Sequence, residues 1–281
     1  MKRCLFVTLL AVLVLCASAS AQSQGNNGHH SSSIWFPEAT FGGMFEKHDS
    51  SSPFFSFKSD FGMKATVWKK GRNSTFFEFM FQTVGADMVN QKVNISGNAY
   101  LLGVGWELDL GETKIAGGIV HLSTHKAEDL GRLVQRKEFR SRALSEGTLD
   151  TADLNVFYGE VGHTFNRLPL RPRVRVRVQP LGFQFRGGVA KFRQPVYLAT
   201  SANLWRGEEK RVTIGSTHEW GEGEPLNSLS VHFHLFERGQ NEGRFQPFVR
   251  WVGGNKTSVS PVEGWNHGGT AVGVRLSFTA K

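Results

Sequence analysis

This sequence is poor in cysteine, has fewer acidic than basic residues and has no long apolar run beyond its first residues. Its two cysteines, Cys4 and Cys16, both lie within the first 21 residues, so a chain that loses this segment has neither disulfides nor thiol chemistry. Beyond residue 21, no apolar run approaches the roughly 20 residues that a membrane-spanning helix requires. A disulfide-stabilised domain, a thiol enzyme and a helical membrane protein are therefore excluded for the rest of the chain.

The first residues have the order of a secretion signal. The basic pair Lys2 and Arg3 precedes the apolar stretch Leu5–Cys16, and the small residues Ala19-Ser20-Ala21 form a cleavage site. We therefore predict a signal peptide over residues 1–21, a polar linker over residues 22–33 and a single domain over residues 34–281.

Basic residues outnumber acidic ones even without this signal. Removing Lys2 and Arg3 leaves 31 basic residues against 24 acidic ones and lowers the formal charge from +9 to +7. Such an excess can indicate nucleic-acid binding. Here, however, arginines alternate with valines over Arg171–Val178 instead of clustering on a helix or a loop, so we expect no nucleic-acid partner.

The rest of the chain alternates between apolar and polar residues, with the period of two that is typical of β-strands. Phe77, Phe79 and Phe81 share one face, for example, and Glu78 and Gln82 share the other. Twelve strands are predicted, namely Phe36–Phe45, Phe55–Lys69, Thr75–Val84, Asn98–Leu110, Thr113–Lys126, Ala152–Phe165, Arg171–Phe185, Pro195–Arg206, Arg211–Trp220, Asn227–Arg238, Arg244–Val252 and Gly269–Phe278.

The connections between these strands are short and long in turn. Lys70–Asn73 and Gly111–Glu112 are short, whereas Glu46–Pro53, Gly85–Gly97, Ala127–Thr151 and Gly253–Gly268 are long. Bacterial outer-membrane barrels have this asymmetry, with tight periplasmic turns and long outer loops. The predicted fold is therefore all-β: a single antiparallel transmembrane β-barrel of about 12 strands in a bacterial outer membrane, in contact with its lipids. An even number of strands places both the N- and C-termini in the periplasm.

The last strand is similar to the C-terminal signal that outer-membrane barrels present to their insertion machinery. Val272, Val274, Leu276 and Phe278 share one face, and Gly273 lies on the other. The resemblance implies that the barrel assembly machinery is a partner. In the known signals the aromatic residue usually ends the chain, whereas three residues follow it here.

A row of arginines marks the predicted lumen. Two hypotheses remain open for it: the row is charge-paired inside a filled lumen, or it forms an anion path or a site for a phosphorylated or carboxylated ligand. The alternation slips at Gln179–Pro180, where we predict a β-bulge. The arginines and the carboxylates expected to answer them are Arg171, Arg173, Arg175 and Arg177, with Glu78, Glu107, Asp109 and Glu219.

Four histidines are candidates for hydrogen bonding or for metal binding. His232 and His234 are two residues apart on one strand, and His121 and His125 lie on another. No cysteine or carboxylate accompanies them in the sequence. We therefore favour hydrogen-bonding histidines of the lumen and expect neither a metal nor another cofactor.

The stretch Val120–Asp129 contains the clearest motif. His121, Ser123 and His125 project from one face, and a histidine beside a serine can act as base and nucleophile. The opposite face contains Leu122 and is the better lipid face, so we expect the polar triplet to point inward. His-x-Ser resembles the motif of the outer-membrane phospholipase A and lipid A deacylase families, in which the histidine is the base, the serine is the nucleophile, and both face the membrane.

The same stretch also resembles a family of uncharacterised bacterial outer-membrane barrels with the pattern Tyr-His-x-Ser-Ser-His-x-Gly-Asp-Glu. His121, Ser123 and His125 match that pattern, and Thr124 replaces its second serine. This resemblance supports the barrel and its location without adding a reaction. The main prediction is thus a structural or ligand-binding barrel with a polar lumen. A narrow anion-preferring pore and a hydrolase of lipid acyl esters are the alternatives.

Overall fold

A computed structural model describes most of the chain beyond the predicted linker. The described residues are 33–49, 55–89, 92–126, 153–184, 188–190, 196–207, 210–220, 225–238, 242–260, 262 and 264–280. The predicted signal peptide, nearly all of the linker and the long connection Ala127–Thr151 lie outside these residues. Within the described part of the chain, no helix has the length and apolar character needed to cross a membrane.

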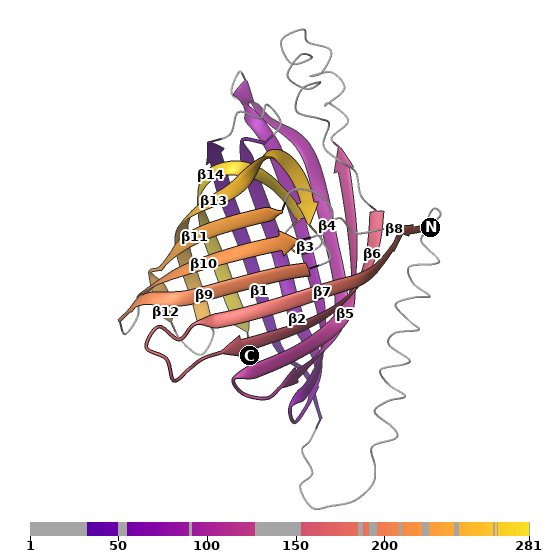
Figure 1. Ribbon diagram of the computed structural model, residues 1–281, viewed down its shortest axis with the longest axis vertical. Coiled ribbons are helices and arrows are strands. Elements are labelled where there is room, and N and C mark those ends of the chain that lie inside the picture. Colours follow the sequence, from indigo (N-terminus) through magenta and orange to yellow (C-terminus); the bar gives the residue numbers. More distant parts are fainter. Residues whose placement is uncertain are drawn as a thin grey trace, which may run out of the picture. The chain divides into compact units, whose positions relative to one another are not determined.

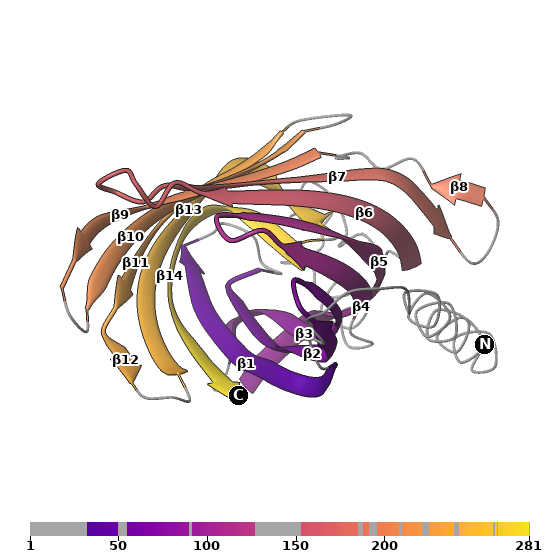
Figure 2. The same ribbon diagram turned by 90° about the horizontal axis from the view of Figure 1, so that it is seen from below.

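The described residues form one antiparallel sheet that closes on itself (Figures 1 and 2). Each long strand pairs with its neighbours in the chain, β1 pairs with β14, and β11 pairs with β13 to complete the ring. Two short strands extend it, β8 on β7 and β12 on β13. The strands are β1 (Ile34–Asp49), β2 (Phe57–Lys70), β3 (Asn73–Val89), β4 (Lys92–Asp109), β5 (Thr113–Lys126), β6 (Asp153–Thr164), β7 (Arg173–Gln184), β8 (Gly188–Ala190), β9 (Val196–Arg206), β10 (Arg211–Trp220), β11 (Leu226–His234), β12 (Phe236–Arg238), β13 (Glu242–Ser260) and β14 (Gly264–Ala280).

The predicted barrel of twelve long strands is confirmed, but two of its predicted loops are wrong. Gly85–Gly97 and Gly253–Gly268 are mostly strand, because β3 and β4 extend to residues 89 and 92 and β13 and β14 to residues 260 and 264. Both hairpins contain irregularities in register, after Val84 and after Val252. In the sequence, glycines at these irregularities look like the start of a loop. In the structure, strand pairing continues beyond them.

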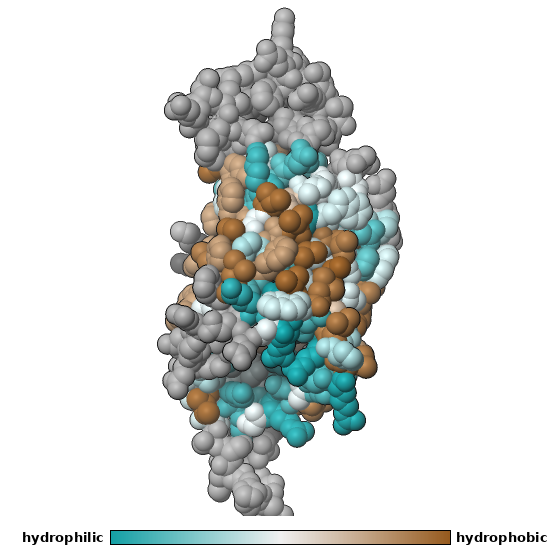
Figure 3. All heavy atoms as spheres, turned by 90° about the vertical axis from the view of Figure 1, so that its left-hand side faces the viewer, coloured by the Kyte–Doolittle hydropathy of each residue, from teal (hydrophilic) through white to brown (hydrophobic). Residues whose placement is uncertain are grey.

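The outer and inner faces of the barrel differ as the alternation predicted. Large apolar side chains, among them Phe61, Trp106 and Phe233, are exposed on the outside. Figure 3 shows hydrophobic side chains gathered across the middle of one side of the barrel, with hydrophilic ones toward both ends. The inner face carries buried polar groups such as Gln82 and Glu219. This is the inverse of a water-soluble barrel and typical of a membrane-spanning one.

The arginine strand begins later and bends where predicted. β7 starts at Arg173, and Arg171 lies before it in an exposed turn with a φ of 42°. Arg171 is thus not part of the predicted row. In the ladder with β6, Phe157 pairs with Leu181 and Gly159 with Val178, so one extra residue of β7 is accommodated between them. This confirms the predicted bulge at Gln179–Pro180.

The end of β14 belongs to the closing ladder. Three residues follow Phe278, unlike in the known assembly signals, and of these Thr279 and Ala280 lie within β14 and pair with Thr40 and Ala39 of β1. The hydroxyls of Thr40 and Thr279 are 3.0 Å apart. Phe278 is exposed on the outer face, together with the three apolar residues that alternate with it.

The strands on either side of β14 approach it closely at Gly273. A Cβ at this position would overlap the carbonyl oxygen of Phe45 and lie 2.6 Å from Cζ of Phe248. We expect Gly273→Ala to lower the free energy of unfolding by about 1–3 kcal/mol, because backbone as well as a ring must move. The measurement is urea unfolding of the detergent-purified protein, followed by its gel mobility without heating.

Gly159→Ala is the matched control for this substitution. Gly159 also lies in a strand, β6, but a Cβ there would meet no atom within 4 Å. It is expected to leave stability nearly unchanged. Equal losses in the two variants would show that strand propensity, and not close approach, determines the effect.

Candidate functional site

His121, Ser123 and His125 point outward from β5, which corrects the expected inward direction. Their cross-strand neighbour Tyr100, paired with Ser123, is exposed on the outside of the barrel. Leu122, between them in the sequence, is fully buried inside it. The triplet therefore lies on the outer surface, at the end of β5 that leads into the long connection.

An unexpected apolar region inside the barrel explains which face of β5 points inward. Val120 and Leu122 belong to a buried cluster with side chains from β3, β4, β6 and the segment before β2. The lumen is therefore polar on one side and apolar on the other. The apolar face of β5 fills this part of the lumen instead of meeting lipid. The cluster consists of Phe55, Phe76, Val84, Ala99, Leu101, Val120, Leu122 and Tyr158.

Two hydrogen bonds organise the outward triplet. Ser123 Oγ lies 3.0 Å from His125 Nε2. His121 Nδ1 lies 3.2 Å from Oδ1 of Asn155, its cross-strand partner on β6. An amide oxygen only accepts hydrogen bonds, so this contact places the proton on Nδ1 and leaves the lone pair on Nε2 of His121. One imidazole thus contacts the hydroxyl, and the other is fixed in the tautomer of a general base.

Aromatic rings flank this group along the outer surface. Tyr100 packs edge-on against His125, with ring centroids 5.8 Å apart, and against Phe81 at 5.1 Å. Phe157, two residues beyond Asn155, is exposed on the same side. A hydroxyl, two imidazoles and an amide thus lie within an apolar surface.

A second outward histidine on the other side of the barrel provides a comparison. His218 Nδ1 on β10 lies 2.8 Å from Oδ1 of Asn227 on β11, and its ring stacks on Trp220. The nearby Ser216 hydroxyl is 2.8 Å from that of Thr200, not from an imidazole. Asn155 and this second pair were both missed from the sequence, since a cross-strand partner can be identified only once the register is known.

The three arginines of β7 face the lumen, but their surroundings differ. Arg173 and Arg175 line a cavity inside the barrel. Arg177 is buried, lies over the ring of Tyr158, and donates to Oε2 of Glu160 at 2.7 Å. Glu160, which is not among the predicted carboxylates, is therefore the ion-pair partner of Arg177 and Arg175. The alternation of β6, with Tyr158 and Glu160 opposite Phe157 and Val161, was the signal for it.

Glu107 and Asp109, expected to face the arginines, instead pair with lysines. Glu107 accepts from Lys64 at 3.4 Å and from Lys114 at 3.1 Å. Asp109 accepts from the backbone of Gly111 at 2.8 Å and lies 3.6 Å from the Lys114 ammonium. They form a separate charged group near the turn between β4 and β5, because Lys114 is the ladder partner of Asp109 and Lys64 of β2 reaches Glu107.

The four histidines considered for a metal site are not brought together. His232 lines the lumen cavity, and the buried His234 lies 3.0 Å from the Thr213 hydroxyl. His121 and His125 are on the opposite face of a strand that is not adjacent to β11. Among the described residues, no group of three or more metal-ligating side chains is formed.

A buried carboxylate near the C-terminal end of β1 contacts two cations and a histidine. Glu46 is fully buried, and its Oε1 accepts from Arg250 at 2.6 Å. The same oxygen lies 3.6 Å from the Lys58 ammonium and 3.3 Å from His48 Nε2. Lys58 and His48 are themselves buried. The cluster links β1, β2 and β13 across the inside of the barrel.

Fold and surface together define a twelve-stranded β-barrel of the outer-membrane type, with a polar group on its apolar exterior. Comparisons with solved structures agree with this class. The chain is similar to the outer membrane phospholipase A from Escherichia coli, with 8% identity, a TM-score of 0.51, and coverage of 86% of this chain and 97% of that one.

The Salmonella typhi outer membrane phospholipase dimer with bound calcium is similar at 8% identity and a TM-score of 0.51, over 85% of this chain and 89% of that one. The KdgM porin in complex with disordered oligogalacturonate shares 10% identity at a TM-score of 0.45, over 86% and 98% of the two chains. No family model and no curated protein sequence matches the chain. At 8% identity, the two similarities with a TM-score of 0.51 show the fold alone.

Proposed function

We propose that the protein is a hydrolase of lipid acyl esters that acts from the outer surface of a membrane barrel. The observation that carries this proposal is the outward group on β5 and β6: the Ser123 hydroxyl in contact with one imidazole, beside a second that Asn155 orients. Polar groups on an apolar exterior cost free energy and usually mark function. A serine flanked by imidazoles is a nucleophile with its base.

The reaction follows from the positions of these groups. The proposed reaction requires rotation about χ1 of Ser123, so that its Oγ leaves His125 and approaches Nε2 of His121. Oγ then bonds to the ester carbonyl carbon while its proton passes to that nitrogen. The tetrahedral intermediate expels the alcohol, which takes the proton back, and an acyl-serine remains. Water, deprotonated by the same imidazole, cleaves the acyl-serine and releases the fatty acid.

We further propose that the barrel lies in a bacterial outer membrane, with its short turns and both termini on the periplasmic side. The apolar exterior and the short turns at one end support this orientation. Ser123 would then lie in the outer leaflet, where lipids are its substrates as well as its surroundings. The assembly machinery remains the partner expected from β14. Fractionation with outer membranes, and a terminus accessible to protease only from the periplasm, would test this arrangement.

The hydrolase proposal is tested by fatty-acid release from phospholipid and from lipid A in mixed detergent micelles, with calcium and without. The purified full chain is expected to release fatty acid. Ser123→Ala removes the nucleophile and is expected to lower the rate by about 10³-fold or more. Ser216→Ala is the matched control, because it also removes a serine hydroxyl from a strand, but one that contacts the Thr200 hydroxyl and not an imidazole. Equal rates for wild type and Ser123→Ala, or no release from either lipid, would refute the proposal.

A further inference from the structure

The inside of the barrel contains a cavity that the proposed hydrolysis does not use. Its volume is about 410 Å³, and its lining comes from strands on opposite sides of the barrel. Small side chains on the inner faces of β9 and β10, Ala199 and Gly215, leave this space open. A cavity of this volume lies in the range that small ligands occupy.

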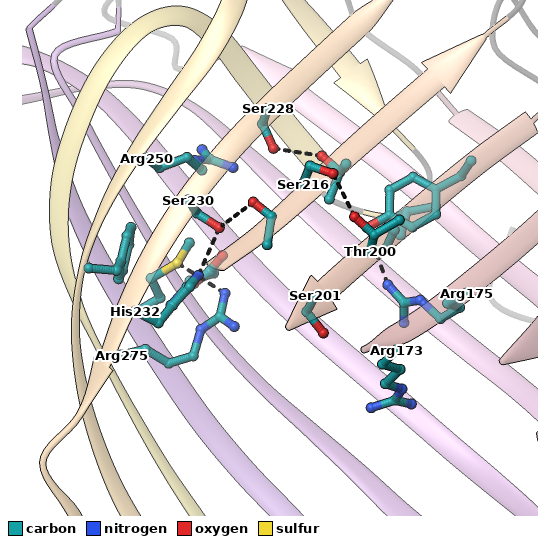
Figure 4. Close-up of a pocket in the computed structure, with 18 of the residues that line it drawn as sticks. Arg173, Arg175, Thr200, Ser201, Ser216, Ser228, Ser230, His232, Arg250 and Arg275 are labelled. Atoms are coloured by element: carbon teal, nitrogen blue, oxygen red, sulfur yellow. Dashed lines mark hydrogen bonds between the residues drawn. The ribbon is translucent and has the colours of Figure 1, made fainter. Parts of the chain in front are cut away.

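One part of the wall is cationic. Five basic side chains from β2, β7, β13 and β14 line the cavity, and Asp60 is the carboxylate among the lining residues. In Figure 4, Arg250 and Arg275 lie on one side of the cavity and Arg173 and Arg175 on the other. The five are Lys58, Arg173, Arg175, Arg250 and Arg275.

Some of these cations are paired with carboxylates, and others are not. Lys58 and Arg250 share Glu46, and Arg175 lies 4.0 Å from Glu160. Within the described residues, neither Arg173 nor Arg275 has a carboxylate at ion-pair distance, and the Arg275 guanidinium donates to Met44 Sδ at 3.4 Å. Two guanidinium groups are therefore available to an anion from opposite sides of the cavity.

The remaining wall is a row of hydroxyls on adjacent strands. Thr217 Oγ1 lies 2.6 Å from Ser228 Oγ, and Ser230 Oγ lies 3.0 Å from His232 Nε2. The Tyr197 hydroxyl accepts from Arg175 at 3.2 Å, which joins the row to the cationic wall. Hydroxyl groups both donate and accept, so this row suits a ligand that carries several hydroxyls of its own.

From these two walls we infer that the lumen binds a small polyhydroxylated oxyanion, a sugar acid or a sugar phosphate, with its acid group between Arg173 and Arg275 and its hydroxyls along β9, β10 and β11. Charge-assisted hydrogen bonds from the guanidinium groups fix the anion, and the hydroxyl row discriminates it from a simple inorganic ion. This binding is independent of Ser123, since the two sites lie on opposite faces of the barrel wall.

The test is calorimetric titration of the purified full chain in detergent with glucuronate, glucose and inorganic phosphate. Glucuronate is expected to bind at least tenfold more tightly than glucose, which lacks the charge, and than phosphate, which lacks the carbon-bound hydroxyls. Arg173→Gln combined with Arg275→Gln should weaken glucuronate binding at least tenfold. Arg171→Gln is the matched control, because Arg171 lies in the exposed turn before β7, and it should bind as wild type does.

Three outcomes would overturn this inference: no binding of glucuronate, glucose or phosphate binding as tightly as glucuronate, or an equal loss in Arg171→Gln. Gel mobility without heating verifies that each variant is folded. The single variant Arg173→Gln replaces the double one if the latter does not assemble, with an expected loss of at least threefold. Because Ser123→Ala should bind glucuronate normally, failure of this inference is distinguishable from failure of the hydrolase proposal.

Discussion

Replacing Glu46 with alanine is expected to lower the free energy of unfolding by about 3–5 kcal/mol, because it removes a fully buried carboxylate that pairs with Arg250 and with the buried Lys58. Glu46 Oε1 accepts from Arg250 at 2.6 Å and lies 3.6 Å from the Lys58 ammonium, which is itself buried. Without the carboxylate, two positive charges remain close together inside the barrel. The measurement is thermal and urea unfolding in detergent, followed by gel mobility without heating.

Glu107→Ala is the control for this prediction. Glu107 also pairs with two cations, Lys64 and Lys114, but both of their side chains are nearly half exposed. Such pairs contribute about 0–1 kcal/mol, since water solvates the charges that remain. A loss for Glu46→Ala no larger than that for Glu107→Ala would show that the buried cluster adds little to stability.

The second large effect is expected at the two histidines beside Ser123. His121→Ala should lower lipid-ester hydrolysis by about 10²–10⁴-fold, the range for loss of a general base. Of these two histidines, His121 has its Nδ1 held by a neighbouring strand, at 3.2 Å from Asn155 Oδ1, so its Nε2 is the ring nitrogen that would accept the proton. His125 contacts Ser123 at 3.0 Å in the resting arrangement, and His125→Ala is expected to lower the rate only about tenfold.

Asn155 and His218 complete this experiment. Asn155→Ala should reduce kcat more than it changes KM, because Asn155 acts through His121 and does not touch the lipid. His218→Ala removes an outward histidine with the same kind of amide partner and should leave the rate unchanged. A greater loss in His125→Ala than in His121→Ala would assign the base to His125 instead. A loss in His218→Ala would show that outward histidines act through stability.

Much of the fold follows from the sequence, because bulk and charge separate the faces of most strands. Phe77, Phe79 and Phe81 against Glu78 and Gln82 leave little choice about which side meets lipid. Proline also identified the bulge in β7, since it cannot donate to a ladder. Strand ends were less predictable, because the glycines near residues 85 and 253 permit bulges as readily as loops.

The site was harder to predict because both faces of β5 mix polar and apolar residues. Its direction depends on what fills the lumen opposite Leu122, and that filling comes from strands distant in sequence, such as Phe55 and Tyr158. The link between His121 and Asn155 spans 34 residues and depends on the register of β5 and β6. Local patterns therefore identified the polar triplet of β5 but neither its direction nor its partner on β6.

The ladder between β1 and β14 has a consequence for how this chain folds. Most ladders join strands that follow one another, so their hairpins require only local loop closure. The contact between Thr40 and Thr279 instead joins residues 239 positions apart. Contacts of such high sequence separation slow folding, and the barrel cannot close before its last strand is available. Until the barrel closes, β1 and β14 have unpaired edges, and we expect these edges to be the parts of the folding chain most prone to aggregation.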